Sequence, residues 1–273
     1  MSERPTSATA TAPAPAPERE PVAGAPAPPP GPGGGTALLG AGALVALATT
    51  VVLGLRLPPT VEQGPYARLI AIHPPLAWAA YLAFGVCALA SALWLWRRTR
   101  APRWDRLAVA SAEVGVVFCA LTLVTGSIWG RPTWGVWWTW DARLTSTALL
   151  LALFAGYLAL RRVSYDPEAR ARRCAVAALV AVADVPIVHF SVDWWRTLHQ
   201  GRSLAQLTPQ SDLDGSYTSV MLLGFVAMTL LYAWLVVHRT RVEVLEARLE
   251  AAGFDAALEE RRAEAGLTGE VTP

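Results

Sequence analysis

The sequence predicts an all-α polytopic membrane protein with six transmembrane helices, both termini in the cytoplasm and a tryptophan-rich loop on the outer face. Three observations support this prediction. The chain is 53% hydrophobic and only 16% charged, with a mean hydropathy of +0.36, whereas soluble domains are about one quarter charged. Its apolar residues form long blocks, and its arginines are distributed unevenly between the connections of those blocks.

The N-terminal segment differs from the rest of the chain. Residues 1–35 contain ten of the 21 prolines, together with alanine and glycine. Such a segment buries too little apolar surface to offset the entropy of ordering, so we expect a disordered tail. The first apolar block covers 22 residues, 36–57, and is longer than the apolar core of a signal peptide. We therefore expect it to be a spanning helix.

A spanning helix needs about 20 mostly apolar residues, and six blocks meet this requirement. They are 36–57, 74–96, 107–128, 144–160, 174–191 and 218–237. The fourth block is short, and the fifth is interrupted by Asp184 and Pro186. Together the blocks define a membrane domain over residues 36–238.

The arginines predict the orientation, because connections rich in positive charge stay in the cytoplasm. Five arginines occur in each of three segments: 97–106, 161–173 and 239–273. Two occur in each of the other three: 56–72, 129–143 and 192–217. Both termini and the two arginine-rich connections are therefore expected inside, and the other connections outside. The cytoplasmic tail 239–273 is expected to be partly helical, over 239–266.

Composition and missing motifs exclude several functions. The net charge of +2 is too small to indicate a nucleic-acid partner. The sequence has no Gly-x-x-x-x-Gly-Lys loop, so this chain carries no ATPase of its own. It has no Cys-x-x-Cys pair, which excludes dithiol redox chemistry and covalent attachment of a c-type haem to this chain.

Tryptophan is concentrated on the expected outer face, where two connections hold seven of the 12 tryptophans. They are Trp129, Trp134, Trp137, Trp138 and Trp140 in the first, and Trp194 and Trp195 in the second. Ordinary membrane proteins also have tryptophans at their interfaces, but five within 12 residues are too dense for a general aromatic belt. We interpret this cluster as a platform for a flat hydrophobic ligand at the edge of the bilayer.

Three of the four histidines share this outer side. His73 stands before Pro74 and Pro75, which fix its backbone at the start of the second span. His189 lies near the outer end of the fifth span, and His199 lies in the following connection. Imidazoles beside an aromatic platform suit haem, whose iron takes axial nitrogen ligands. Spacing alone does not choose two ligands among these three histidines.

Charged residues near the water boundary add to this interpretation, since guanidinium groups match haem propionates in bidentate geometry. The candidates are Arg131, Arg143, Arg196 and Arg202. Asp141 precedes the fourth span and is expected either to pair with Arg131 or Arg143 or to cap that helix, and we favour the cap. Glu113 and Asp184 lie inside spans, where ionisable groups are costly, and both stay unassigned.

Two segments resemble the CcmC family (haem exporter protein C), whose members carry a tryptophan-rich "WWD" signature and handle haem in cytochrome c maturation. The first segment, 129–146, reads WGRPTWGVWWTWDARLTS, and its ending Asp-Ala-Arg-Leu-Thr-Ser differs from the Asp-Pro of related haem lyases. The second segment, 186–201, reads PIVHFSVDWWRTLHQG and resembles the last outward loop of the family. The resemblance covers about residues 36–238.

The resemblance implies a function and a set of site residues. It implies that His73 and His199 are the two axial ligands of haem b and that His189 is not one. It also implies a haem-cradling WWD loop over 129–146, centred on Trp134, Trp137, Trp138, Trp140 and Asp141. Proteins of this family deliver haem and are not enzymes. They present it, at the outer face of the bacterial inner membrane, to the haem chaperone CcmE, with CcmD and the ABC pair CcmA and CcmB as further partners.

Three other functions compete with haem delivery. A transmembrane haem carrier in an ABC-type complex needs a matching cytoplasmic site, and the sequence shows no obvious one. A b-type electron-transfer subunit carries facing histidine pairs inside its helix bundle, whereas these histidines are expected at the outer rim. A purely structural permease subunit leaves the tryptophan cluster unexplained.

Overall fold

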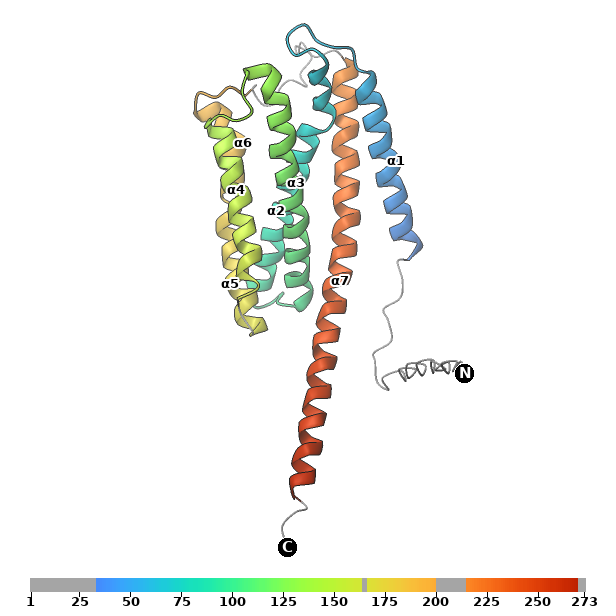
Figure 1. The fold of residues 1–273 in the computed structure, drawn as a ribbon, viewed down its shortest axis with the longest axis vertical. Helices are drawn as coiled ribbons and strands as arrows, with labels where there is room; N and C mark the ends of the chain where they lie inside the picture. The colour runs from blue at the N-terminus through green and yellow to red at the C-terminus, as the bar shows by residue number, and fades with distance from the viewer. Residues whose placement is uncertain (1–32, 164–165, 200–214, 270–273) are drawn as a thin grey trace, which may run out of the picture. The chain divides into compact units, whose positions relative to one another are not determined.

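The computed structural model describes residues 33–163, 166–199 and 215–269. Helices account for most of these residues (Figure 1). In chain order they are α1 (Gly34–Arg56), the 3₁₀ helix η1 (Pro65–Ala71), α2 (His73–Leu95), α3 (Pro102–Trp134), α4 (Ala142–Leu160), α5 (Pro167–Ala181), α6 (Asp184–Trp194) and α7 (Gly215–Gly269).

Six helical segments are long and apolar enough to cross a membrane, which confirms the number and order predicted from the sequence. They are Gly34–Arg56, Pro65–Leu95, Pro102–Trp134, Ala142–Leu160, Pro167–Trp194 and Gly215–Ala263. The second segment combines η1 with α2, and the fifth combines α5 with α6. The side of the membrane on which each connection lies stays a prediction.

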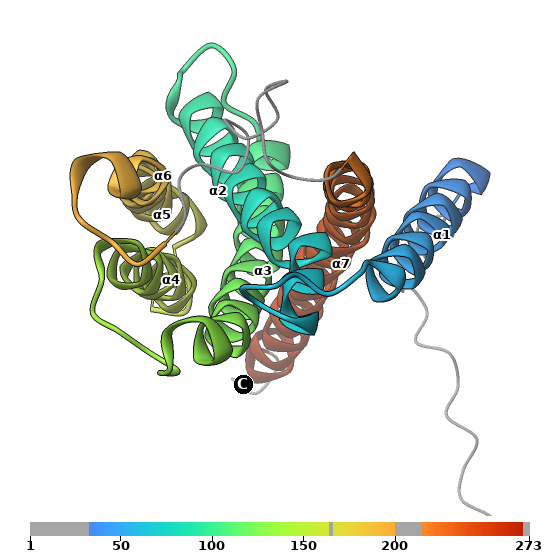
Figure 2. The same cartoon turned by 90° about the horizontal axis from the view of Figure 1, so that it is seen from above.

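The most extensive contact between two helices is the one between α2 and α3. Small residues let these two helices approach closely, as is common in membrane proteins. At Gly115 of α3, an added Cβ would lie 2.7 Å from Cε1 of Phe84 on α2. Phe84 also stacks on Phe154 of α4, with ring centroids 3.8 Å apart. Seen from above, α4, α5 and α6 form a group on one side of α2 and α3, and α7 and α1 lie on the other side (Figure 2).

Buried polar contacts join the helices at specific points. The Ser111 hydroxyl donates to the carbonyl of Ala83 at 2.8 Å, so it accepts the proton of the Tyr232 hydroxyl, whose oxygen is 2.6 Å away. This contact links α2, α3 and α7. Arg161, after α4, forms a bidentate ion pair with Asp105 of α3 at 2.8 and 2.9 Å. Bidentate pairs between arginine and a carboxylate are stronger than single hydrogen bonds between neutral groups, because both geometry and charge are matched.

The two acids inside spans have different surroundings. Glu113 on α3 pairs with Arg239 on α7, with Oε1 and Nη2 3.0 Å apart, so it holds two helices together. Asp184 is only 5% exposed and is the first residue of α6. The fifth span is interrupted just before it, between Ala181 and Asp184. Pro186 explains the interruption, because proline cannot continue a helix but fits the first turn of a new one.

Several expected boundaries differ from the structure, among them the end of the third span. The third span was expected to end at residue 128, but α3 continues to Trp134, so the first part of the expected loop 129–146 is helical. At the other end of the chain, the segment expected as a partly helical tail belongs to α7. The expected disordered segment 1–35 lies outside the described residues except for 33–35, and α1 begins at Gly34.

Candidate functional site

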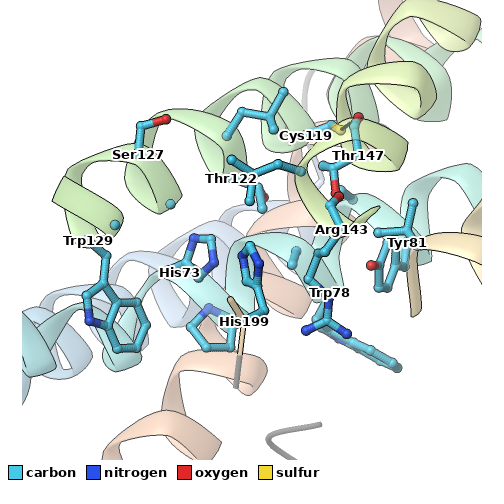
Figure 3. Close-up of a pocket in the computed structure, with 18 of the residues that line it drawn as sticks. His73, Trp78, Tyr81, Cys119, Thr122, Ser127, Trp129, Arg143, Thr147 and His199 are labelled. Carbon is cyan, nitrogen blue, oxygen red and sulfur yellow. Dashed lines mark hydrogen bonds between the residues drawn. The ribbon is translucent and has the colours of Figure 1, made fainter. Parts of the chain in front are cut away.

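The histidines and part of the tryptophan cluster meet at one cavity of about 650 Å³ (Figure 3). Its volume is within the range of small-molecule sites, about 300–1,000 Å³. The lining residues come from the same end of each helix, namely the start of α2, the end of α3, the start of α4, and parts of η1, α6 and α7. The polar and aromatic members include His73, Trp78, Tyr81, Trp129, Trp134, Arg143, His189 and His199.

His73 is positioned by the start of α2. The prolines at 74 and 75 occupy the first turn, where their missing N–H groups cost no hydrogen bond. On the facing helix, Thr125 Oγ1 lies 3.0 Å from His73 Nδ1. Trp129 packs edge-on against the imidazole at a centroid distance of 5.8 Å. Gly126 makes room for the ring, because a Cβ there would lie 3.0 Å from Cε1 of His73.

His199 is positioned by contacts from another part of the chain. It lies outside the helices, five residues beyond the end of α6 at Trp194. Its Nδ1 is 2.8 Å from Oδ2 of Asp141, and its backbone N–H donates to Thr197 Oγ1 at 3.1 Å. Trp134, the last residue of α3, packs against the imidazole with ring centroids 4.7 Å apart.

Asp141 caps α4, which confirms the structural role we favoured for it. Its Oδ1 accepts the Leu144 N–H at 2.7 Å, and its Oδ2 accepts hydrogen bonds from His199 and Thr197. Burial alone would raise the pKa of Asp141, but hydrogen bonds from His199, Thr197 and the Leu144 N–H lower it to about 2. Asp141 is therefore a carboxylate at neutral pH. Its contact with His199 had no counterpart in the sequence analysis.

The expected WWD loop 129–146 consists of three parts. Trp129 and Trp134 belong to the last turns of α3 and line the cavity. Gly135 ends this helix with a left-handed backbone, φ +81°, which glycine adopts without strain. Residues 135–141 form the connection, and α4 begins at Ala142. The continuation of α3 explains why two of the five tryptophans face the cavity.

The remaining tryptophans of the cluster do not line the cavity. Trp137 and Trp140 are 60% and 81% exposed. Trp138 packs edge-on against Trp140, with ring centroids 5.5 Å apart. The cluster is therefore divided between a cavity-lining pair, Trp129 and Trp134, and three tryptophans on the connection, of which Trp137 and Trp140 are exposed and Trp138 is half-buried.

The four candidate arginines also differ in position. Arg143 lines the cavity, and its Nη2 donates to the carbonyl of His189 at 3.1 Å. Arg131 is exposed and donates to the Gly135 carbonyl at 2.5 Å, so it fastens the end of α3. Arg196 is exposed, and Arg202 lies outside the described residues.

His189 lines the cavity as well, so the structure does not remove it from the candidate ligands. Its ring packs edge-on against Tyr81 of α2, with centroids 6.3 Å apart. Trp78 of α2 also lines the cavity, donates to Thr229 Oγ1 of α7 at 3.0 Å and contacts Phe225.

Trp78, Tyr81 and Phe225 were not singled out from the sequence. One available signal was helical spacing, because residues four and eight positions after His73 lie on the same face of α2. Ala77 and Tyr81 occupy these two positions, and both line the cavity. No comparable signal in the sequence pointed to α7.

Comparisons with known proteins identify the family of this chain. The family model described as heme exporter protein C matches residues 35–254. A protein named heme exporter protein C from Bradyrhizobium diazoefficiens is 39% identical over 214 residues, which are 78% of this chain and 80% of that protein. Its namesake from Haemophilus influenzae is 39% identical over 205 residues, 74% and 82% of the two chains.

A third relative, the heme exporter protein C of Escherichia coli K12, is 38% identical over 192 residues, 69% of this chain and 74% of that protein. The region matched by the family model contains the second to fifth spans, nearly all of the first, most of the sixth and every residue that lines the cavity. The chain belongs to the heme exporter protein C family.

Proposed function

We propose that this protein binds haem at the outer face of the bacterial inner membrane and presents it for the assembly of c-type cytochromes. The observation that supports this most strongly is the pair His73 and His199 on one cavity, each with its Nδ1 engaged by a neighbouring side chain. Two imidazole donors suit an iron whose other four positions are filled by a porphyrin.

The cavity walls support the same proposal. Haem needs apolar and aromatic walls for its ring and cationic partners for its propionates. Trp129 and Trp134 stand beside the two imidazoles, and Arg143 is the cationic residue of the lining. Haem b, which enters without a covalent bond to the protein, is the form we propose, since this chain has no Cys-x-x-Cys motif.

The proposed role of these residues is to hold and orient the cargo. Because histidines would occupy both axial positions of the iron, a partner would react at the edge of the porphyrin, where it can reach a vinyl group. Positioning of this kind is the main contribution that a scaffold makes to a bimolecular step. The exposed tryptophans Trp137 and Trp140 lie on the connection next to the cavity, and we propose that the partner approaches there.

The partner that receives the haem is proposed to be the chaperone CcmE, with CcmD and the ABC pair CcmA and CcmB in the same assembly. Both chain ends are proposed to be cytoplasmic, because the arginine-rich connections 97–106 and 161–173 lie at the opposite end of the helices from the cavity. Haem delivery without catalysis is the activity that this arrangement supports.

The competing functions make different demands on the structure. A complete carrier needs a site that opens to each side of the membrane in turn, whereas the cavity lining comes from one end of the helices. Uptake of haem by sealed vesicles that contain this protein alone would favour the carrier. Reduction and reoxidation of the bound haem with quinol would favour an electron-transfer subunit.

The experiment that tests the proposal compares absorption spectra of the detergent-purified wild type, His73→Ala, His199→Ala and His238→Ala. His238 packs on Trp234 of α7 and does not line the cavity, so its variant is the matched control. Wild type and control are expected to show low-spin haem b, and the other two variants to lose haem or become high-spin. If both of these keep the wild-type spectrum, the ligand assignment is wrong and His189 is replaced next.

A further inference from the structure

We propose that the two axial ligands are unequal: Asp141 is a positioning residue that makes His199 the retained haem ligand, and His73 is the ligand that is released first. This inference rests on the proposed function and goes beyond it, because it states which iron–histidine bond opens when the haem leaves. It depends on the groups that contact Nδ1 of each imidazole, which is the ring nitrogen that is not offered to the iron.

The hydrogen bonds determine which ring nitrogen carries the proton. Thr125 has one hydroxyl proton, and its Oγ1 donates it to the carbonyl of Leu121 at 2.8 Å. The same oxygen therefore accepts from Nδ1–H of His73. Asp141 is a carboxylate and accepts only, so Nδ1–H of His199 is also the donor. Both imidazoles thus keep the lone pair on Nε2, the nitrogen available to iron.

The acceptors differ in charge. A carboxylate that accepts the N–H of a ligating histidine makes the imidazole a stronger base and a stronger metal ligand. A hydrogen bond to an ionised acceptor is also roughly twice as strong as one between neutral groups. His199 has this support from Asp141 at 2.8 Å, whereas the partners of His73 are neutral: the Thr125 hydroxyl at 3.0 Å and the backbone of Thr122. The His199–iron bond is therefore expected to be the stronger one.

Asp141 is held in place by contacts within the protein itself. Its side chain is only 7% exposed. Its two oxygens accept hydrogen bonds from Leu144, Thr197 and His199. The Thr197 oxygen in turn accepts the backbone N–H of His199. This network gives His199 a defined orientation although its segment is not helical.

The substitution Asp141→Asn tests the proposal because asparagine is about as good a helix cap as aspartate. With the amide oxygen on Leu144, the amide NH₂ faces Nδ1 of His199 and favours the imidazole form protonated at Nε2, which cannot bind iron. The same change of form inactivates a serine protease when the aspartate of its triad is replaced by asparagine. Glu113→Gln, which also removes one negative charge but lies away from the cavity, is the matched control.

The first measurement is the rate at which each variant loses haem to apomyoglobin. His199→Ala is expected to lose haem about tenfold faster than His73→Ala. This factor is the lower end of the change in metal affinity that follows when the hydrogen-bond partner of a ligating histidine is replaced. Adding Asp141→Asn to His73→Ala is expected to accelerate the loss by about tenfold. Adding it to His199→Ala should have no further effect, because the ligand it supports is already gone.

Two further readouts separate positioning from a general loss of structure. Asp141→Asn is expected to raise the midpoint potential of the haem, since a negative charge near the iron stabilises its ferric state, whereas Glu113→Gln leaves it unchanged. In the haem-free protein labelled with ¹⁵N-histidine, the proton on the His199 ring should move from Nδ1 to Nε2 in Asp141→Asn. In Glu113→Gln it should stay on Nδ1.

The outcomes distinguish this inference from the proposed function. If wild type binds no haem, the proposed function fails. If wild type and both single histidine variants bind haem, but the two variants lose it at equal rates and Asp141→Asn changes neither rate nor potential, the inequality of the ligands is overturned while haem binding stands.

Discussion

His73 and His199 line the same cavity, but the chain positions them by different means. His73 is the first residue of α2, and its place follows from its own neighbours in the sequence, the two prolines that begin the helix. His199 lies in a non-helical segment and is oriented by Asp141, which is 58 residues away along the chain. The backbone of His73 is therefore set by a locally encoded helix start, and α3 then confines its ring through Thr125 and Gly126. His199 has no helix of its own and depends on α4 meeting the segment after α6.

This difference predicts how each half fails. The His73 half should fail when its space is filled, because the helix leaves the ring nowhere to move. The His199 half should fail when single hydrogen bonds are removed, because it has no helix to support it.

The largest effect is expected from Gly126→Val. A Cβ added at this position would already lie 3.0 Å from Cε1 of His73, so the larger side chain displaces the imidazole. Haem affinity is expected to fall by roughly 100-fold, the upper end of the effect of misplacing a metal ligand. Titration of the purified protein with haem measures it. Gly85→Val, on the exposed face of α2 where an added Cβ meets nothing within 4 Å, is the control. Equal affinities in both variants would contradict the close packing at His73.

The next largest effect is expected from Thr197→Val, which tests the His199 half. The variant loses the bond to Asp141 and the acceptor of the His199 N–H. At about 1 kcal/mol each, the loss of both should weaken haem binding by about 30-fold in the same titration. Thr49→Val, an exposed position on α1 whose hydroxyl bonds only within its own helix, should change nothing. Wild-type affinity in Thr197→Val would mean that the segment is held by other contacts.

A smaller effect is expected from Trp134→Ala, and it separates the two parts of the tryptophan cluster. Trp134 contacts the His199 ring at 4.7 Å, and such ring pairs contribute about 0.5–1.5 kcal/mol, so haem binding should weaken about fivefold. Trp140→Ala removes an 81% exposed side chain and should leave haem affinity unchanged while lowering transfer to the chaperone. The reverse pattern in binding and transfer assays would overturn the division of the cluster.

The smallest effect is expected from Thr125→Val. This variant removes the hydroxyl that accepts the His73 N–H, but α2, Gly126 and Trp129 still confine the ring. A twofold weakening of haem binding, about 0.5 kcal/mol, is therefore expected, with Thr125→Ser as the variant that restores it. A loss as large as that of Thr197→Val would show that the two halves depend equally on hydrogen bonds.

The sequence predicted the membrane fold well because hydropathy is a local property. All six spans were found, and the interruption before Asp184 followed from Pro186. The end of α3 was predicted too early, because Trp129, Arg131 and Pro132 look like a loop in composition. The structure shows that they continue the helix and that the chain turns only at Gly135.

The site was predictable only in part, for the same reason. The backbone position of His73 and the cap at Asp141 depend on neighbours within a few residues, so their sequence context pointed to them. The pairing of Asp141 with His199 depends on contacts between distant segments, and no spacing rule reveals it. Likewise, Phe225 and Thr229 of α7 approach the cavity only through the packing of α7 beside α2.

The most direct test of the central claim, that both halves meet on one haem iron, is electron paramagnetic resonance of the ferric protein with and without imidazole. Wild type is predicted to give one low-spin signal. His73→Ala and His199→Ala are each predicted to become high-spin as purified and to return to low spin when imidazole fills the vacated position. A low-spin signal in either variant without imidazole would contradict the claim and show that the iron takes its ligands elsewhere.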